Sequence, residues 1–405
     1  MNKSKTLLLL TGISLLCISL SVGVAINNTH RYINPVKADE YEMICNASQN
    51  KLHTSSSTTY GSKVINTESG NKVTLTYFNV SKSANSSYWQ GISQNGFIAN
   101  LDALTGLNSL TIVPYSDSGS LKIRWGNMIN PIEKSESIII SDTNPITCYF
   151  NNEKPNYFAI YNLESTEVEI TSIAFNYSCV NVSGYDNGDD AIVSPDNKLV
   201  AYGKYPQYEV INTDIKSELE GLGVNEDVFF TYQQVKYVRS GDKYFYVSPI
   251  RWKVLRISDG IYTLISDMLL DTHTYDDDGA TDYIGTGIRN WLLDVFYKKV
   301  FPSDDNILYL PIDRDEVTLL TQQEIRSSYS SVLGTASDKS KKIAYVTDYA
   351  KANGAFNSNL AGRYWTRTAA SGNIYYVATN GDYNGSYAPE TTGVSVRPYI
   401  TIYTD

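Results

Sequence analysis

The chain has 405 residues, more than one hydrophobic core usually organises, so we expect two folded domains after an N-terminal leader. Its hydrophobic content of 42% and charged content of 19% are those of a globular protein and argue against intrinsic disorder. The net charge of −10 and the lack of a Lys/Arg cluster argue against nucleic-acid binding. The 33 tyrosines favour extracellular, β-rich surfaces.

Residues 1–38 have the pattern of a signal peptide. Lys3 and Lys5 precede a mostly apolar run from Leu7 to Ile26, and Val36-Lys37-Ala38 offers cleavage before Asp39. We therefore expect a secreted, extracellular protein. The alternative is an uncleaved N-terminal anchor that keeps it at the cell surface, because the run is about twenty residues long. Cleavage would remove four basic and no acidic residues, so the mature chain would avoid anionic membranes.

Residues 39–182 predict an all-β sandwich of jelly-roll type. Short runs alternate between apolar and polar positions, and clusters of Asn, Ser, Gly and Pro separate them at the spacing of an antiparallel sandwich. Examples of one-face positions are Leu121, Ile123 and Trp125 in one run, and Ile173, Phe175, Tyr177 and Cys179 in another. This pattern, above all the closing hairpin from Tyr157 to Cys179, resembles the galactose-binding-like sandwiches of secreted carbohydrate-active proteins.

Two tryptophans of this domain are candidates for stacking on a sugar ring. Trp125 shares the phase of its buried neighbours and is expected in the core, whereas Trp89 follows a polar loop and is the candidate ligand contact. Outside the leader the chain has three cysteines, Cys45, Cys148 and Cys179, which allow at most one disulfide. Cys45 with Cys179 is the first expectation, and three buried thiols are the alternative.

Residues 183–198 are rich in Gly, Asp, Asn and Pro and are expected to form the linker to a second domain at 199–405. That domain is predicted to contain both strands and helices. Strands are predicted at 250–255 and 262–266, and a hairpin at 229–247. Helices are predicted near 211–222, after Thr286, at the Thr321–Glu324 capping box and near 347–351. In the helix after Thr286 the apolar face comprises Ile288, Trp291, Leu292, Val295 and Phe296.

A series of short motifs in this domain carries a resemblance. They are Tyr-Gly-x-Tyr-Pro at 202–206, Arg-Trp-x-Val-Leu at 251–255, Ile-Arg-x-Trp-Leu at 288–292, Thr-Asp-Tyr-Ala-Lys at 347–351, Trp-x-Arg at 365–367 and Val-Arg-Pro-x-Ile at 396–400. The series resembles an uncharacterised domain family of secreted bacterial proteins. That family is related to the C-type-lectin-like fold of formylglycine-generating enzymes and phage tropism determinants. The resemblance implies a C-type-lectin-like fold for this α+β domain and no particular activity.

The segment from Ala369 to Thr392 is the predicted binding loop of the second domain. The resemblance implies that such loops vary between rigid terminal strands, and here the segment is rich in Tyr, Asn and Gly, which offer ring faces and short polar groups. The predicted ligand contacts are Tyr375, Tyr383, Asn384, Tyr387 and Glu390. An idle surface loop is the alternative.

Catalytic chemistry has little support in the sequence. After residue 180 the chain has no cysteine and one histidine, His273, which excludes a Cys or multi-His redox metal site. An acidic loop with Asp271, Asp276, Asp278 and Asp282 is a candidate calcium site, and a solvated acidic loop is the alternative. Arg289, Arg367 and Arg397 are expected to hold the fold.

The sequence therefore predicts a secreted, non-catalytic, adhesin-like binding protein that recognises a glycan or a protein surface outside the cell. No nucleic-acid partner and no cofactor other than calcium is expected. One alternative is a carboxylate-based extracellular glycan hydrolase, since Asp and Glu are plentiful. The other is that the sandwich is a spacer that presents a single binding domain.

Overall fold

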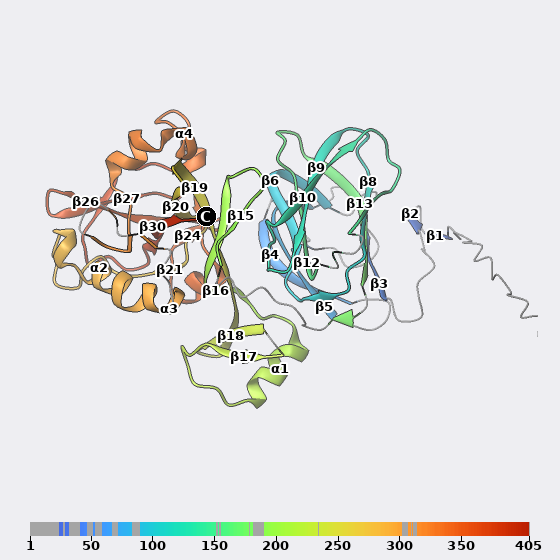
Figure 1. Ribbon diagram of the computed structural model, residues 1–405, viewed down its shortest axis with the longest axis horizontal. Coiled ribbons are helices and arrows are strands. Elements are labelled where there is room, and N and C mark those ends of the chain that lie inside the picture. The colour runs from blue at the N-terminus through green and yellow to red at the C-terminus, as the bar shows by residue number, and fades with distance from the viewer. Residues whose placement is uncertain are drawn as a thin grey trace, which may run out of the picture.

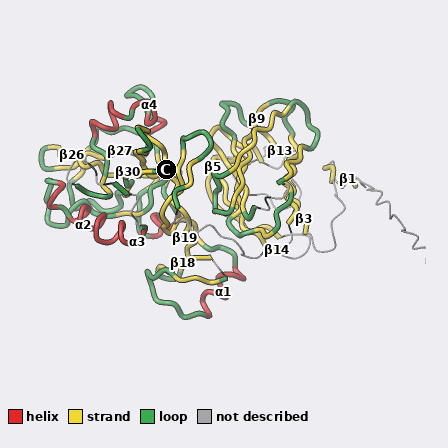
Figure 2. Tube along the Cα trace, in the orientation of Figure 1, coloured by secondary structure: helices red, strands yellow, loops and turns green. Residues whose placement is uncertain are grey.

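The structure is a computed structural model. It describes residues 24–26, 29–31, 41–46, 52, 59–66, 72–82, 90–150, 153, 155–177, 179–180, 190–233, 235–301, 307–308, 310 and 314–404. Figure 1 shows a β-sandwich beside a second unit that contains the described helices, and Figure 2 shows that strands dominate the sandwich while the second unit combines strands, short helices and loops. The prediction of a mostly β protein with sandwich-like sheets is confirmed, and the C-type-lectin-like fold of residues 199–405 stays a prediction.

The predicted leader falls mostly outside the described residues. Its described part is a short antiparallel pair of strands, β1 Val24–Ile26 and β2 Thr29–Arg31. Trp89 also lies outside the described residues. Among the residues that are described, no helix is long and apolar enough to cross a membrane.

Two antiparallel sheets form the sandwich, and they join where the first residues of β6 and β13 pair. The first sheet has the order β4 Thr59–Asn66, β5 Lys72–Lys82, β6 Gln90–Asn100, β12 Tyr157–Tyr161, β9 Gly119–Gly126, β10 Lys134–Ile140. The second has the order β11 Ile146–Tyr149, β8 Ser109–Pro114, β13 Val168–Tyr177, β3 Tyr41–Asn46. A separate pair joins β7 Leu104–Thr105 to β14 Cys179–Val180.

Strand alternation explains the sandwich core. One face of each strand is apolar and buried between the sheets, as with Ile98 of β6, Ile123 of β9 and Phe175 of β13. Trp125 shares that phase but is only partly buried, because it lies near the end of β9. There it packs against Phe150, with ring centroids 5.2 Å apart, and its Nε1 donates to Glu153 at 2.6 Å.

Both expectations for the cysteines leave Cys148 unpaired, and the structure agrees with them. Cys148 has a free thiol in the sandwich core, and burial raises its pKa to about 12. The register of β3 and β13 places Cys45 opposite Ile173. The pairing of Cys45 with Cys179 stays a prediction. The side chains of these two cysteines lie outside the described part.

Three sheets build the second domain. The largest has the order β15 Ile192–Val193, β16 Leu199–Glu209, β19 Lys243–Ser258, β20 Ile261–Ser266, β30 Tyr399–Tyr403, β22 Val317–Thr318, with β17 Phe230–Tyr232 and β18 Val235–Ser240 added along β19. The next has the order β21 Asp271–Thr272, β29 Ser395–Val396, β26 Tyr364–Ala370, β27 Asn373–Val377, β28 Ser386–Tyr387. The smallest has the order β23 Ala344–Tyr345, β25 Ala361–Gly362, β24 Asn357–Ser358.

The predicted linker is partly inside this domain. Residues 190–198 of the 183–198 segment are described, and β15 pairs with β16 within them. The turn is closed by Ser194, whose hydroxyl accepts from the amides of Lys198 and Leu199, and Asn197 adopts φ 54°. The polar composition of the predicted linker therefore indicates a hairpin turn as well as a domain boundary.

The helical elements are short and lie in the second domain. They are α1 Thr213–Gly221, η1 Tyr283–Gly285, α2 Gly287–Trp291, η2 Leu292–Tyr297, α3 Lys298–Val300, η3 Glu324–Ser328, α4 Ser330–Leu333, η4 Ser340–Lys342 and α5 Asp348–Ala352. The predicted Thr321 capping box is confirmed, since Thr321 Oγ1 accepts from the Glu324 amide at 3.0 Å and Glu324 Oε2 accepts from the Thr321 amide at 2.7 Å.

The predicted apolar face after Thr286 is only partly right. Ile288, Leu292 and Phe296 are buried, but Val295 is 48% exposed. The reason is that residues 292–297 form a π-helical turn, whose wider winding rotates Val295 out of the apolar phase. Thr286 Oγ1 donates to the Tyr283 carbonyl at 2.8 Å and makes no side-chain cap.

The three arginines hold the fold, as predicted. Arg289 donates two hydrogen bonds to the Asp315 carboxylate, at 2.9 and 2.5 Å. Arg397 is 1% exposed, donates to the Ser266 carbonyl at 2.9 Å, and lies over the Tyr364 ring. The Arg367 guanidinium forms an ion pair with Glu324 at 3.2 Å.

Candidate functional site

The outer face of the first sandwich sheet is covered by the second domain, and we call this contact the domain joint. Residues of that face that would otherwise meet water are buried, including Thr74 and Thr76 of β5, Ala99 of β6 and Ala159 of β12. One apolar cluster combines residues of both domains, with members Leu101, Ala103, Ile129, Tyr157, Tyr208, Val210, Leu219, Val235, Tyr237, Tyr244 and Tyr246. The sandwich is therefore packed onto its neighbour, which the spacer alternative did not predict.

A buried carboxyl group connects the two domains at the joint. Asp102 of the sandwich is 3% exposed and accepts from the Tyr246 hydroxyl at 2.6 Å and from Asn212 Nδ2 at 3.3 Å, both in the second domain. It also accepts from the Thr74 amide of its own domain at 2.7 Å. Burial raises the pKa of Asp102, while these hydrogen bonds oppose the rise.

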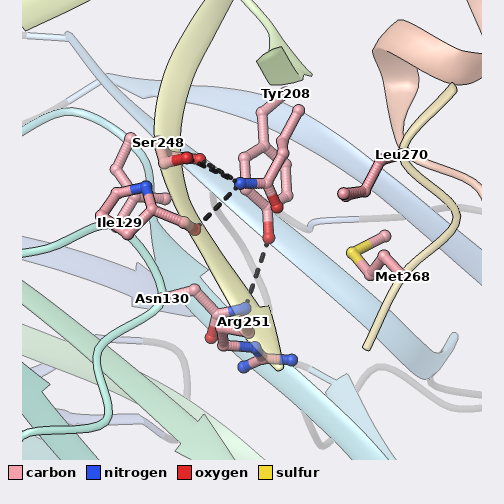
Figure 3. A pocket seen from close by; sticks show the side chains of 9 residues that line it. Ile129, Asn130, Tyr208, Ser248, Arg251, Met268 and Leu270 are labelled. Carbon is pink, nitrogen blue, oxygen red and sulfur yellow. Dashed lines mark hydrogen bonds between the residues drawn. The ribbon is translucent and has the colours of Figure 1, made fainter. Parts of the chain in front are cut away.

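A second polar contact lies further along the joint, where Asn130 Nδ2 of the sandwich donates to the Tyr208 hydroxyl at 3.3 Å (Figure 3). Arg251 Nη1 donates to the Tyr161 hydroxyl at 2.5 Å, and the Arg124 guanidinium lies 4.9 Å from the centre of that ring. A cavity lined by Asn130, Tyr208 and Arg251, among others, has a volume of about 10 Å³, room for no more than about one water molecule. It is too small to be a ligand site.

At one edge of the joint the domains separate into an open cleft of about 370 Å³, which we call the joint cleft. Its volume is within the range of about 300–1,000 Å³ that ligand sites have. The sandwich and the second domain both contribute to its lining: Tyr60, Phe78 and Asn79 come from the sandwich, and Ile343, Tyr345, Ser358, Asn359, Ala361, Thr379 and Asn380 from the second domain.

The rings of the joint cleft are held by cross-strand packing. The register places Phe78 of β5 opposite Phe97 of β6, and Phe97 opposite Tyr161 of β12, so their rings form a row with centroid distances of 5.9 and 5.4 Å. Phe78 is the outermost member of this row. Its ring centre lies 4.3 Å from Tyr345 of the second domain and 6.5 Å from Tyr60 of β4. The three cleft rings are half-buried.

The amide side chains of the joint cleft are presented by irregular backbone. Asn79 lies at a β-bulge in β5 with φ 50°, where Asn is tolerated better than most residues, and its Nδ2 donates to the Gln94 carbonyl at 2.7 Å. Asn359 has φ 48° in the turn between β24 and β25. Asn380 accepts from the Asp382 amide at 3.0 Å in the turn after β27. The backbone conformation at each of these asparagines therefore fixes where its side-chain amide begins.

Two tyrosines of the cleft lining, Tyr60 and Tyr345, lie near acidic residues. The Tyr60 hydroxyl is buried near Asp348 of the second domain, and burial together with that carboxyl raises the pKa of Tyr60 well above its ordinary value. Burial raises the pKa of Asp348 to about 6. The pKa of Tyr345 is raised by burial and by Asp267, which is itself paired with Arg251 at 2.5 Å.

The predicted binding loop contributes to the cleft through two residues that were not singled out, Thr379 and Asn380. Tyr383 is 4% exposed and lies in the core of the second domain, with Lys342 Nζ 5.3 Å from the centre of its ring. Its prediction as a ligand contact is wrong, because the turn after Asn380 folds the ring back onto the domain. A loop composition cannot show in which direction one ring points.

The other predicted residues of that loop lie apart from the cleft lining. Tyr375 is in strand β27 and half-buried. Tyr387 stacks on Tyr376 with ring centroids 4.1 Å apart, and its hydroxyl accepts from Arg363 at 2.9 Å. Asn384 and Glu390 are exposed. Their role in binding stays a prediction.

The acidic loop does not assemble a metal site in the described structure. Asp271 accepts from the Tyr205 hydroxyl at 2.5 Å and from Asn353 at 2.9 Å, and burial raises its pKa. Asp276 accepts amides of its own loop and of Gly287, which lower its pKa against the opposing effect of burial. Among the described residues, no group of three or more His, Cys, Asp or Glu could hold a metal ion, so Asp278 and Asp282 find no ligand set there.

A larger cavity of about 430 Å³ lies within the second domain. Arg367 and Glu324 line it as an ion pair, and the Tyr329 and Tyr399 hydroxyls lie 3.1 Å apart. These four side chains are paired within one domain, whereas the joint cleft is lined by rings and amides from two domains. The joint cleft is the better candidate site.

Sequence reasoning missed most of this site. The lining residues come from five separated stretches of the chain, and none of those stretches is unusual in composition. One signal was present in β5, where Thr74, Thr76 and Phe78 occupy the face that a sandwich strand normally gives to solvent. An aromatic at the end of that face was a reason to expect a partner surface.

No protein-family model matches the chain, and no curated protein matches it. Among solved structures, one from the Ruminococcus flavefaciens cellulosome matches with 10% identity and a TM-score of 0.19, covering 34% of this chain and 94% of its own. A family 11 carbohydrate-binding module from Clostridium thermocellum matches with 7% identity and a TM-score of 0.17, covering 35% and 90%. A cupin domain from Bordetella pertussis has 13% identity and a TM-score of 0.17, covering 31% and 100%. Likeness at this level carries no argument about function.

Proposed function

We propose that this protein is a secreted, non-catalytic binding protein that recognises a glycan outside the cell through the joint cleft. The observation that carries the proposal is the lining of the cleft, in which three aromatic rings and three Asn side chains from two domains surround about 370 Å³. Half-buried rings offer flat apolar faces, and amide groups both donate and accept hydrogen bonds. A sugar ring presents both kinds of surface.

The composition of the cleft lining supports the part of the proposal that concerns binding without turnover. A glycan hydrolase of the common kind places two carboxyl groups about 5–10 Å apart on either side of the scissile bond. None of the described residues that line the joint cleft is Asp or Glu. In the larger cavity the described lining has one carboxylate, Glu324, and it is paired with Arg367. Neither site supports the hydrolase alternative.

The finer parts of the proposal rest on the sequence. Secretion rests on the signal-peptide pattern of residues 1–38, and the C-type-lectin-like assignment of 199–405 rests on the motif series. The burial of two motif residues supports the latter, because Trp365 and Arg397 are each 1% exposed, as residues that determine a fold should be. A surface protein is the other class of ligand, and the experiment below separates the two.

The test uses the intact secreted chain on an array of glycans and extracellular proteins. We expect glycan retention without release of sugar, and Tyr345→Ala should weaken it by about 1–3 kcal/mol, the usual effect of removing an aromatic anchor. Tyr149→Ala is the matched control, since Tyr149 is a 61% exposed tyrosine on the other sheet. Retention that is unaffected by Tyr345→Ala, retention of proteins alone, or released sugar would contradict the proposal.

A further inference from the structure

The charges in and around the joint cleft indicate which class of glycan it binds. We infer that the cleft selects uncharged glycans and rejects anionic ones such as uronates and sulfated sugars. The inference rests on the proposed function and specifies the ligand class of the same site.

The described lining of the joint cleft contains no ionisable Asp, Glu, Lys, Arg or His side chain. Its polar groups are the amides of Asn79, Asn359 and Asn380 and the hydroxyls of Tyr345, Ser358 and Thr379, since the Tyr60 hydroxyl is buried. A carboxylate or sulfate that entered would lose hydration and find no cation in the lining to replace it. A hydroxyl group would exchange water for an amide at little cost.

The nearest charged groups behind the cleft do not help an anion. Asp348 lies behind Tyr60, and a carboxyl group at that position offers no positive charge to an anion. Glu209 donates its backbone amide to Asp348 at 3.2 Å, and the Glu209 carboxylate is paired with Lys243 at 2.7 Å.

The charges behind Tyr345 and next to Asn380 are paired, and Lys342, next to Ile343 of the lining, donates its ammonium group to the carbonyls of Gly334, Thr335 and Asp338. Behind Tyr345, Asp267 is bound by Arg251 at 2.5 Å and by Lys253 at 3.1 Å. Next to Asn380, Asp382 is paired with Lys339 at 3.0 Å. These cations are already neutralised. The net charge of −10 adds a long-range repulsion of polyanions.

The experiment measures affinity of the full secreted chain for matched hexasaccharides by calorimetry at physiological salt. The neutral probes are hexamers of glucose, mannose, xylose and N-acetylglucosamine, and the anionic probes are hexagalacturonate, hexamannuronate and a heparin hexasaccharide. We expect at least one neutral hexamer to bind, and every anionic probe to bind roughly tenfold more weakly or worse.

A gain-of-function variant tests the physical reason. Ser358 is an exposed residue of the lining, so Ser358→Lys should place an ammonium group at the cleft without removing a buried contact. It should strengthen binding of an anionic probe by roughly fivefold or more. Ser118→Lys makes the same charge change at an exposed position of the sandwich and should not.

The outcomes distinguish the two claims. Anionic hexamers that bind as tightly as neutral ones, with both lost in Tyr345→Ala, would overturn the selectivity and leave glycan binding in the cleft intact. No binding of any neutral or anionic glycan would overturn the proposed function itself. An equal gain in Ser358→Lys and Ser118→Lys would show that net charge, and not the lining, sets the preference.

Discussion

Replacing Asp102 with Ala tests whether the domain joint stabilises the whole chain. Its carboxyl group receives hydrogen bonds from Tyr246, Asn212 and Thr74, at 2.6, 3.3 and 2.7 Å, and all four residues are buried. Asp102→Ala would leave three buried donors without this acceptor, and each such donor costs about 1–3 kcal/mol. The variant also removes the cost of burying a carboxyl group, which the raised pKa of Asp102 reports.

The net loss in free energy of unfolding should therefore be about 3 kcal/mol, below the sum of the three donors. Tyr246→Phe removes only one of the hydrogen bonds and should cost about 1.5 kcal/mol. Asp117→Ala is the matched control, because Asp117 is an exposed acid of the sandwich, and its effect should stay within about 0.5 kcal/mol.

The assay is urea denaturation of the intact chain, followed by tyrosine and tryptophan fluorescence and by far-UV circular dichroism. The wild type should unfold in one transition that both probes share, because the joint couples the two domains. A deficit below about 1 kcal/mol for Asp102→Ala would refute the reasoning, since it would mean that water reaches the orphaned donors. Two separate wild-type transitions would refute the coupling.

Two further predictions concern other parts of the second domain. Asp348 has its pKa raised to about 6 by burial, so the folded state binds a proton that the unfolded state releases near its ordinary pKa of about 3.9. The stability that this group contributes is present below about pH 4 and is lost as the pH rises through about 6. Asp348→Asn should therefore reduce the pH dependence of the free energy of unfolding by up to about 3 kcal/mol. Parallel pH profiles of the unfolding midpoints of the wild type and the variant would contradict this. Tyr383→Ala should destabilise the protein by about 3 kcal/mol because its buried ring leaves a cavity, while glycan binding at the cleft stays within about twofold once the protein is folded; a stable variant that loses binding would restore Tyr383 as a ligand contact.

The local structure was largely determined by the sequence itself. Alternating apolar residues specified the sandwich strands, because side chains of a strand point to opposite faces in turn. Thr321 with Glu324 specified a helix start, and Thr347 specified another, with its Oγ1 accepting from the Ala350 amide at 3.0 Å. These signals depend on spacings of a few residues, which the chain alone contains. The same reasoning misplaced Val295, since a π-helical turn changes the phase without a marker in the composition.

The candidate site was decided only by the tertiary structure. Tyr345 is far from Tyr60 and Phe78 in the sequence. The three rings meet because the outer face of one sandwich sheet packs against the second domain. Tyr345 lies in an apolar run and Tyr383 lies among Asn, Gly and Asp, yet Tyr345 borders a cleft and Tyr383 fills a core. Both have the same apolar surface to bury. Which partner covers each ring depends on contacts between distant segments, and a local sequence pattern carries no record of those contacts.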